Sequence, residues 1–356
     1  MLGRQTFAII DLTALKHNFS VMAQFASGSK TIAVIKADAY GHGAKEVAEA
    51  LASQAEAYAV AFIDEAMMLR NQGIKNPILL LEGVLNEEEM RCAQRLNLWV
   101  TIHSPDHFNC LRALDSHERP VCWIKIDTGM HRLGISLPIA DKVLGENSDL
   151  LNENTVLCSH LASADEPNNP FTLQQNTALR ALASRYHLAL SIANSAGISN
   201  WPDCHGDWNR LGISLYGCAQ PAQANVGLKP VMSLHAPIIA LRRIQAGESV
   251  GYAQSWIAQR PSTIATVAIG YADGYPRHAK TGTPAWLNNQ RINLVGRVSM
   301  DMLTFDVTDV PQVKTGDSVE LWGNNIAVET VAEHASTISY ELLTRVSARV
   351  NRRYIA

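Results

Sequence analysis

Short apolar runs alternate with amphipathic stretches through the first two-thirds of the chain. The stretches at residues 43–54, 64–73 and 86–96 carry apolar residues at helical spacing. Apolar strands that alternate with such helices at intervals of about 20 to 35 residues are typical of βα units around a parallel sheet. The sequence predicts eight strands, and their apolar runs are residues 31–36, 58–63, 77–83, 98–104, 121–127, 155–161, 188–195 and 205–211.

Polar residues stand at the ends of most of these predicted strands. The active site of a (β/α)8 barrel lies at the carboxyl ends of its strands, where such residues would gather. No GxGxxG motif opens a helical stretch, which disfavours a dinucleotide-binding open sheet. The pattern therefore predicts an α/β fold with an N-terminal (β/α)8 barrel of the TIM type. The polar strand-end residues are Lys36, Glu82, His103, Lys125, His160, Asn194, Ser195 and Arg210.

The pattern changes near residue 230, where β-rich runs separated by turn signals replace the alternation. Two helical patterns, at residues 328–337 and 340–350, close the chain. We therefore predict a barrel domain over residues 1–230 and a mainly β domain over residues 231–356. The β-rich runs are residues 233–244, 263–271, 291–300, 302–310 and 318–323.

Composition excludes several classes of protein. Apolar residues make up 47% of the chain and charged residues 18%, with a net charge of −3. There is no basic stripe with interleaved aromatic residues, so we expect no nucleic-acid partner. No apolar run has the length of a membrane span, and the N-terminus lacks the pattern of a signal peptide. The six cysteines form no CxxC pair and the histidines no HExxH motif, so we expect a cytoplasmic protein without disulfides or a metal site.

Lys36 ends an apolar run and begins the stretch KADAYGHG. A lysine at this place is often a snorkelling side chain that caps a strand. The alternative is a lysine that forms a Schiff base with pyridoxal 5'-phosphate (PLP), which needs a phosphate cradle, a ring support and a partner for its pyridine nitrogen. Ser195 and Gly212 follow the seventh and eighth strands, where barrels often bind phosphate. His160 and Arg210 are candidates for the ring and the nitrogen.

The stretch at residues 36–43 and seven further motifs resemble those of the alanine racemase family, which consists of fold-type III PLP enzymes. The resemblance spans almost the whole chain and both predicted domains. It implies a homodimer with shared active sites that interconverts L-alanine and D-alanine. The matching motifs are KADAYGHG (36–43), KIDTGMHRLG (125–134), SHLASADEP (159–167), NS (194–195), RLGISLYG (210–217), VGYAQSW (250–256), AIGYADGYPR (268–277) and GRVSMDM (296–302).

The resemblance also implies roles for single residues. Lys36 matches the PLP lysine and one catalytic base, and Tyr252 matches the opposite base, which comes from the partner subunit. Lys125 matches a lysine that carries a carbamate in many members. Implied cofactor contacts are Lys36, Tyr40, His160, Asn194, Ser195, Arg210, Gly212, Ile213 and Tyr340, and implied substrate contacts are Arg132, Tyr271, Met300 and Asp301.

Two bases of these types suit racemisation. The proton leaves Cα on one face and returns on the other, and one side chain cannot readily serve both faces. Tyrosine has an ordinary pKa of about 10, so it needs cationic neighbours to act as a base near neutral pH.

The chain departs from the family pattern at Asp38, Leu211 and the pair Ala253 and Gln254, where many members have Asn, Pro and Gly-Gly. Alternative readings are a racemase of the same family for serine or another amino acid, a non-catalytic PLP-binding protein and a PLP-dependent decarboxylase. A decarboxylase normally has a C-terminal cysteine motif, whereas the last cysteine here is Cys218. An aldolase would use a lysine like Lys36 but would leave Tyr252 without a role.

Overall fold

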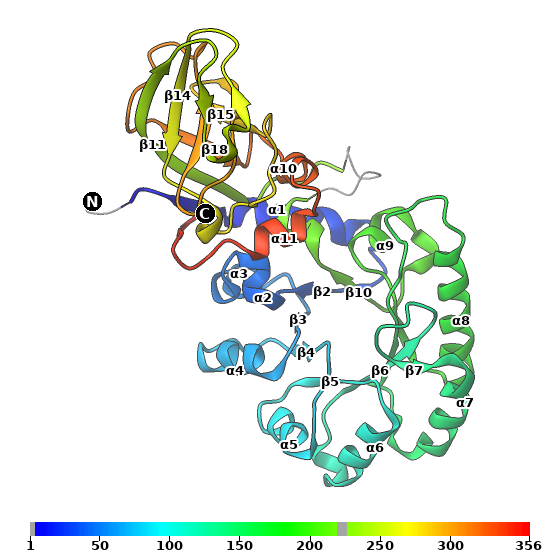
Figure 1. Cartoon of the computed structure of the whole chain (residues 1–356). Helices are drawn as coiled ribbons and strands as arrows, with labels where there is room; N and C mark the ends of the chain where they lie inside the picture. Colours follow the sequence, from blue (N-terminus) through cyan, green and yellow to red (C-terminus); the bar gives the residue numbers. More distant parts are fainter. Residues whose placement is uncertain (1–3, 219–225) are drawn as a thin grey trace.

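The computed structural model describes residues 4–218 and 226–356, which form two bodies joined along the chain. Figure 1 shows a ring of strands with outer helices below a twisted β-sheet body, and the red helices α10 (Val328–His334) and α11 (Ser339–Thr344) lie between them. No helix in the described ranges is long and apolar enough to cross a membrane.

Eight parallel strands form the barrel in the order β10-β2-β3-β4-β5-β6-β8-β9. The Arg210 N–H donates to the Ala193 carbonyl at 3.0 Å and joins the last pair around the ring. Each of the eight predicted runs overlaps one strand, and the predicted barrel is confirmed. The strands are β2 (Lys30–Val34), β3 (Ala57–Val60), β4 (Ile78–Leu80), β5 (Trp99–Ile102), β6 (Cys122–Asp127), β8 (Val156–Cys158), β9 (Ala189–Ser191) and β10 (Trp208–Leu211); the short β7 (Ile135–Ser136) pairs with β6.

Helices cover the outside of this ring, so most strand residues are buried on both faces, as in other parallel sheets. The helix ends follow local chemistry: Asn86 accepts a hydrogen bond from the Glu89 N–H at 2.9 Å and caps a helix with three glutamates in its first turn. The helices are α1 (Leu12–Gln24), α3 (Ala44–Leu51), α4 (Ile63–Asn71), α5 (Glu87–Arg95), α6 (Pro105–Arg112), α7 (Leu137–Glu146), α8 (Phe171–Tyr186) and α9 (Ser195–Asn200).

The second body is an eight-stranded sheet in the order β14-β17-β16-β15-β18-β11-β1-β19, and β14 also pairs with β11. The predicted mainly β domain is confirmed. Its long central strand β11 (Met232–Ile244) bridges several partners. The others are β1 (Phe7–Asp11), β14 (Ser262–Val267), β15 (Pro284–Leu287), β16 (Gln290–Leu294), β17 (Leu303–Asp306), β18 (Ser318–Trp322) and β19 (Asn351–Ile355), with β12 (Ser249–Val250) and β13 (Trp256–Ile257) as a separate pair.

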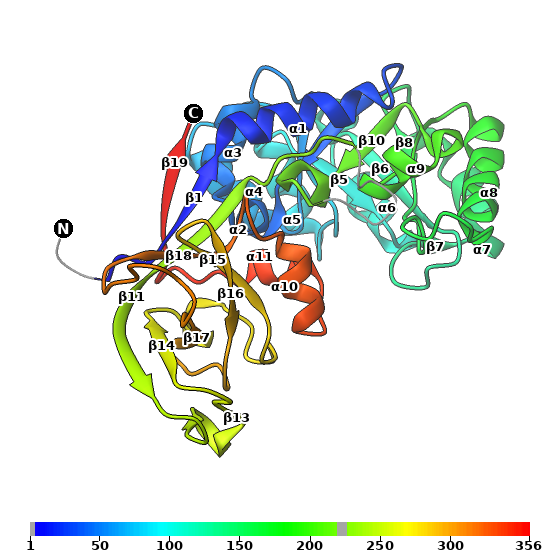
Figure 2. The ribbon, with the colours of Figure 1, turned by 90° about the horizontal axis from the view of Figure 1, so that it is seen from above.

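The first strand of the chain lies in the second sheet. Strand β1 pairs antiparallel with β11 and parallel with β19, and Figure 2 shows these segments side by side. This pairing was not predicted, because the alternating residues of β1 resemble any half-buried strand. The division into residues 1–230 and 231–356 remains our proposal for the two domains.

The C-terminal helix is shorter than predicted. The pattern predicted a helix over residues 340–350, but α11 ends at Thr344. The following backbone turns toward the second sheet, where the Ser347 N–H donates to the Asp273 carbonyl at 3.0 Å. The Arg345 carbonyl lies against Gly274, where a Cβ would come within 2.1 Å of it. Contact with the sheet therefore overrides the helical pattern.

Candidate functional site

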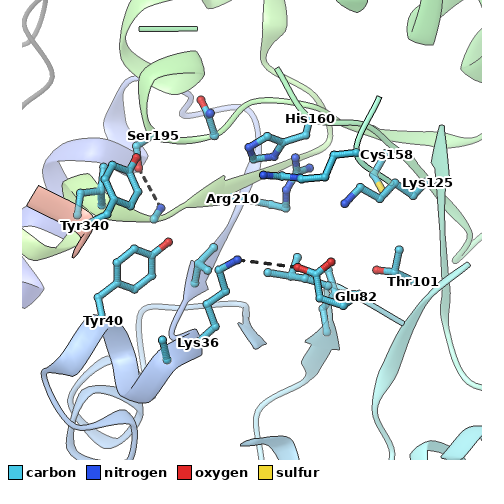
Figure 3. Close-up of a pocket in the computed structure, with 18 of the residues that line it drawn as sticks. Lys36, Tyr40, Glu82, Thr101, Lys125, Cys158, His160, Ser195, Arg210 and Tyr340 are labelled. Atoms are coloured by element: carbon cyan, nitrogen blue, oxygen red, sulfur yellow. Dashed lines mark hydrogen bonds and ion pairs between the residues drawn. The ribbon is translucent and has the colours of Figure 1, made fainter. Parts of the chain in front are cut away.

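A cavity of about 470 Å³ opens at the carboxyl ends of the barrel strands. Figure 3 shows side chains from several strands and from α11 converging on it. The strand-end residue Glu82 lines this cavity and His103 does not. Every barrel residue to which the resemblance assigns a role also lines it, together with Tyr340. They are Lys36, Tyr40, Lys125, Arg132, His160, Asn194, Ser195, Arg210, Gly212 and Ile213.

Lys36 begins α2 (Lys36–Gly41), which is a left-handed turn rather than an ordinary helix. Its four central residues, 37–40, have φ between 51° and 54°. This conformation costs roughly 1–2 kcal/mol per residue other than glycine, so neighbouring groups must hold it. Apart from the glycines on its far side, no residue pattern predicted this turn.

Two side chains from distant segments hold the backbone of the turn. The Ala37 N–H donates to Glu65 Oε1 at 2.6 Å, and the same carboxylate accepts from the Ala61 N–H at 2.7 Å. At the other end of the turn, Arg352 Nε donates to the Gly41 carbonyl at 2.8 Å. Neither Glu65 nor Arg352 was singled out from the sequence, because nothing in their local pattern points to residue 36.

Asp38 and His42 hold the turn from within. Asp38 Oδ1 accepts a hydrogen bond from the Ala44 N–H at 2.8 Å, so its carboxylate caps the next helix and is not among the groups that line the cavity. His42 Nδ1 lies 2.9 Å from the Ala39 carbonyl and 3.0 Å from that of Tyr40. Burial lowers the pKa of His42 to about 4, so the ring is neutral near pH 7.

The Lys36 side chain extends into the cavity toward Glu82. Lys36 Nζ lies 4.0 Å from Glu82 Oε1, and Figure 3 shows this ion pair. Glu82 precedes Gly83, which has φ +75° and packs so closely that a Cβ would lie 2.4 Å from the Thr101 carbonyl. The tight turn therefore directs Glu82 inward, and an acidic partner faces the amine.

Hydroxyl and backbone N–H groups gather on the opposite side of the cavity. Ser195 Oγ accepts from the Gly212 N–H at 2.9 Å and from the Ser214 N–H at 3.3 Å. Gly212 leaves room for Tyr40, whose hydroxyl would lie 3.0 Å from a Cβ at this position. The rings of Tyr40 and Tyr340 are 6.0 Å apart. This combination of donors is suited to an anion such as a phosphate group.

The two tyrosine hydroxyls at this cradle stay protonated at neutral pH. Burial raises the pKa of Tyr340 to about 12 and raises the pKa of Tyr40 above its ordinary range. Both groups can therefore donate hydrogen bonds.

Arg210 crosses the floor of the cavity without a carboxylate partner among its hydrogen bonds. Its guanidinium donates to Ser191 Oγ and to the Ser159 carbonyl, both at 2.6 Å. Burial, with Arg210 and the neighbouring cations, holds the pKa of His160 well below its ordinary value. A neutral imidazole and a permanent cation thus lie together beneath the cavity.

Lys125 lies half-buried on β6, on the other side of the cavity from Tyr40 (Figure 3). Burial is the main cause that lowers the pKa of Lys125, and the charges of Arg210 and Arg132 add to it. Cys158 and Glu82 act in the opposite direction. The amine is therefore more available as an unprotonated nucleophile than an exposed lysine would be.

Four predicted site residues lie elsewhere on the same chain. Among the described residues that line the cavity, none of Tyr252, Tyr271, Met300 and Asp301 is present. They belong to the second body and are exposed: Tyr252 at 66%, Tyr271 at 40% and Met300 at 54% of their accessible surface. Tyr252 precedes β13, which lies at the outer end of the second body in Figure 2.

The departures from the family pattern beside Tyr252 have a structural effect. Ala253 and Gln254 adopt φ of 57° and 50°, a region in which glycine costs little and other residues are strained. Leu211 is fully buried in β10 and fits the apolar interior of the ring. Of the four departures, Asp38, Ala253 and Gln254 lie in left-handed, exposed backbone, and Leu211 is buried.

In residues 4–218 and 226–356, no group of three or more His, Cys, Asp or Glu side chains is placed to hold a metal ion. All six cysteines are free thiols.

Comparisons with known proteins agree along the whole chain. Residues 10–220 match the family model "Alanine racemase, N-terminal domain", and residues 231–354 match "Alanine racemase, C-terminal domain". The chain is 46% identical to an alanine racemase of Alteromonas mediterranea, over 99% of each protein.

Solved structures show the same similarity. The biosynthetic alanine racemase of Pseudomonas aeruginosa superposes with a TM-score of 0.92 at 42% identity, and the match covers 99% of this chain and 100% of that one. An alanine racemase of Bartonella henselae with covalently bound pyridoxal phosphate superposes with a TM-score of 0.91 at 32% identity, over 98% of this chain and 99% of that one.

Proposed function

Because the chain belongs to the alanine racemase family, we propose that it interconverts L-alanine and D-alanine with PLP as its cofactor. The observation that carries this proposal is the position of Lys36. Its amine extends from a strained turn into a cavity that has an anion cradle on one side and an uncompensated arginine on its floor.

The residue types of the cavity fit PLP. The hydroxyls of Ser195, Tyr40 and Tyr340 and the backbone N–H groups of Gly212 and Ile213 would hold its phosphate. Gly212 supports this fit, because a Cβ there would narrow the cradle against the Tyr40 hydroxyl. Asn194 caps α9 by accepting from the Gly197 N–H at 2.9 Å and thereby fixes the position of Ser195.

Arg210 and His160 would hold the ring. Arg210 cannot give up its proton, so it would donate to the pyridine nitrogen and leave that nitrogen unprotonated. Neutral His160 would support the ring without adding charge. PLP, when bound, supplies an electron sink that makes the Cα proton of the substrate acidic.

Two bases then act on that proton. Lys36 Nζ would remove or return it on one face of Cα, and the Tyr252 hydroxyl would do so on the other. Each positioned base contributes roughly 10²–10⁴-fold in rate. Arg132, at the rim of the cavity, would bind the substrate carboxylate.

We propose that a second copy of the chain completes the site. Tyr252, Tyr271, Met300 and Asp301 are exposed on the second body and do not line the cavity of their own chain. Exposed aromatic and methionine side chains are typical of protein interfaces. In the homodimer these residues of one subunit would face Lys36 of its partner.

Mixed dimers test this arrangement. Lys36→Ala and Tyr252→Phe chains are each expected to be nearly inactive, but a hybrid dimer holds one site with both bases. Mixing the two variants should restore activity to as much as half of the parent value per hybrid dimer. A lack of rescue after demonstrated subunit exchange would contradict a shared site.

We further propose that Lys125 carries a carbamate. An unprotonated amine is the form that reacts with CO₂, and burial lowers the pKa of Lys125. The carbamate would supply a negative charge to hold Arg132 toward the substrate. Electron density that shows a bare amine at Lys125 in crystals grown with bicarbonate would contradict this assignment.

The free thiols support a location in the cytoplasm, which we also propose. Six cysteines without a disulfide are typical of a reducing compartment. Cell fractionation with a periplasmic marker tests the location, and recovery with that marker would contradict it.

The direct test of the activity is incubation of the purified protein with L-alanine and, separately, with L-serine. We expect D-alanine to form, and Lys36→Ala should lose both this activity and the visible absorption of the bound cofactor. D-serine formation at a higher rate would assign the alternative substrate of the same family. Bound PLP without either product would leave the non-catalytic alternative.

A further inference from the structure

The segment after α11 connects the barrel cavity with the surface of the second body that carries Tyr252, Tyr271, Met300 and Asp301. We call this cavity and this surface the two half-sites of one chain. Helix α11 carries Tyr340 to the cavity, and residues 345–350 lead from it to β19. Arg349 lies in this segment and points to the second body. Its Nη2 donates to Asp301 Oδ1 at 2.7 Å, and its Nε lies 3.4 Å from Asp273 Oδ1.

Asp273 is a buried carboxylate at the centre of this contact. Its side chain has no exposed surface. Arg4 binds both carboxylate oxygens, at 2.8 and 2.6 Å, and the Gly270 N–H donates to Oδ2 at 3.0 Å. A buried charge needs such partners, so Asp273 is a fixed point to which Arg349 is attached.

The same contact fixes the residues that the proposed function places beside the substrate. The Tyr271 N–H donates to the Ser299 carbonyl at 3.1 Å, and the Ala272 N–H donates to the Met300 carbonyl at 3.0 Å. Gly270 allows the two segments to touch, because a Cβ there would lie 2.3 Å from the Met300 carbonyl. Tyr271, Met300 and Asp301 therefore belong to one hydrogen-bonded unit.

We propose that Arg349 is a positioning residue that sets the orientation of this unit, Tyr271, Met300 and Asp301, toward the substrate in the partner subunit. Arg349 acts through Asp301 and Asp273 and does not itself need to touch the substrate. The inference rests on the proposed function, because the unit has a substrate only in a shared site.

Exposure separates this role from one in stability. About half of the Arg349 and Asp301 side-chain surfaces remains exposed, at 47% and 49%. The Arg349–Asp301 pair has this exposure and contributes little to folding stability. Buried Asp273 keeps both Arg4 contacts and the Gly270 N–H when Arg349 is replaced. Arg349→Gln should therefore fold like the parent, whereas a small displacement of substrate-binding groups strongly affects catalysis.

The test places Arg349→Gln in one chain of the hybrid dimer. The working site of that hybrid takes Lys36 from the Tyr252→Phe chain, and Tyr252, Tyr271 and Asp301 from the Lys36→Ala chain. With Arg349→Gln on the Lys36→Ala chain, we expect the KM for L-alanine to rise about tenfold with a smaller change in kcat. With Arg349→Gln on the Tyr252→Phe chain, the KM should stay within about twofold of the unsubstituted hybrid.

Two further variants complete the experiment. Arg349→Lys keeps the charge but loses the paired donors of the guanidinium. The KM of this variant should therefore rise less than that of Arg349→Gln. Arg260→Gln removes an exposed arginine that pairs with Asp309 in the second body, and it should leave the KM unchanged. An equal rise in both placements, a rise only on the Tyr252→Phe chain, or no rise in either would overturn the role of Arg349. An inactive unsubstituted hybrid from chains that exchange would overturn the shared site itself.

Discussion

The two half-sites of the chain differ in how they are supported. At the barrel mouth, Lys36, Ser195 and Arg210 lie in a cavity where buried groups from distant segments hold them. On the second body, Tyr252 and Tyr271 are exposed to 66% and 40%. One chain therefore has a cavity at the barrel mouth and an exposed group of predicted site residues on the second body. The difference supports our proposal that a second subunit completes the site.

Backbone strain occurs at both half-sites. Left-handed residues occur in the turn at 37–40 and again at Ala253 and Gln254. The first set is held by Glu65, His42 and Arg352. Ala253 and Gln254 are exposed. Strain at the barrel mouth is thus stabilised within the chain, and strain beside Tyr252 lies where a partner would contact it.

The largest expected effect separates the two half-sites directly. Tyr252→Phe should lower kcat for alanine by about 10²–10⁴-fold, because one base is lost. It should leave the affinity for PLP and the visible absorption of the cofactor unchanged, since Tyr252 does not line the cavity of its own chain. Timed assays of D-alanine formation measure kcat, and the visible absorption spectrum of the purified variant measures bound PLP. A loss of bound PLP would contradict the view that Tyr252 lies outside the groups that bind the cofactor.

Acid should lower the free energy of unfolding through His42, which holds the turn at the barrel mouth. The folded state keeps His42 neutral, with its pKa lowered to about 4 by burial, whereas the unfolded chain has the ordinary value near 6.5. The unfolded state therefore binds more protons between these values, so stability is full above about pH 6.5 and falls as the pH drops toward 4. The loss from this residue approaches about 3 kcal/mol.

Urea unfolding at pH 7 and pH 4.5 measures this loss. His42→Asn places an amide donor near the Ala39 carbonyl that does not titrate, so this variant should lose less stability between the two pH values than the parent. An equal loss in both proteins would mean that His42 is not the group that titrates.

Removal of one cradle hydroxyl should have a moderate effect confined to the cofactor. Ser195→Ala takes away the oxygen that accepts from the Gly212 and Ser214 N–H groups. The dissociation constant of PLP should rise about tenfold, the equivalent of one strong hydrogen bond. Fluorescence titration of the cofactor-free protein measures it. Thr177→Ala removes an exposed hydroxyl of α8 that does not line the cavity, and this control should bind PLP normally.

The smallest effect concerns the strained backbone beside Tyr252. Gln254→Gly removes the cost of a left-handed residue, about 1–2 kcal/mol, but adds the entropy cost of glycine, about 0.5–1 kcal/mol. The net result should be a gain of about 0.5 kcal/mol in the free energy of unfolding. Ser255→Gly is the matched control, because Ser255 has φ −72° and should only lose stability. A loss in both variants would show that residue 254 is not strained.

The barrel was predictable because apolar runs and amphipathic stretches alternate regularly along its sequence. Each strand is an apolar run such as residues 57–60, and each ends where a polar residue is needed, so the position of His160 or Arg210 follows from its strand. The motifs around Lys36 and Ser195 added the family and its chemistry.

The supports of the site were not predictable in the same way. Glu65 and Arg352 reach the turn after Lys36 from helix α4 and strand β19, and only folding brings them there. The handedness of that turn was equally hidden, because Ala37, Asp38 and Ala39 are residues that usually favour a negative φ. Long-range contacts of this kind leave no local pattern.

Strand β1 precedes the other strands of the described chain, and its parallel partner β19 follows them. The barrel strands are complete once residue 211 has been synthesised, whereas the second sheet lacks an edge until residue 355 has emerged. Because domains generally fold from the N-terminus during synthesis, the barrel can form on the nascent chain before β19 is available to pair with β1. The cofactor cavity is complete only after Tyr340 and Arg352 have reached it. The pairing of β1 with β19 is therefore a late step in folding, and it joins the first and last strands of the described sheet only after the barrel strands have been made.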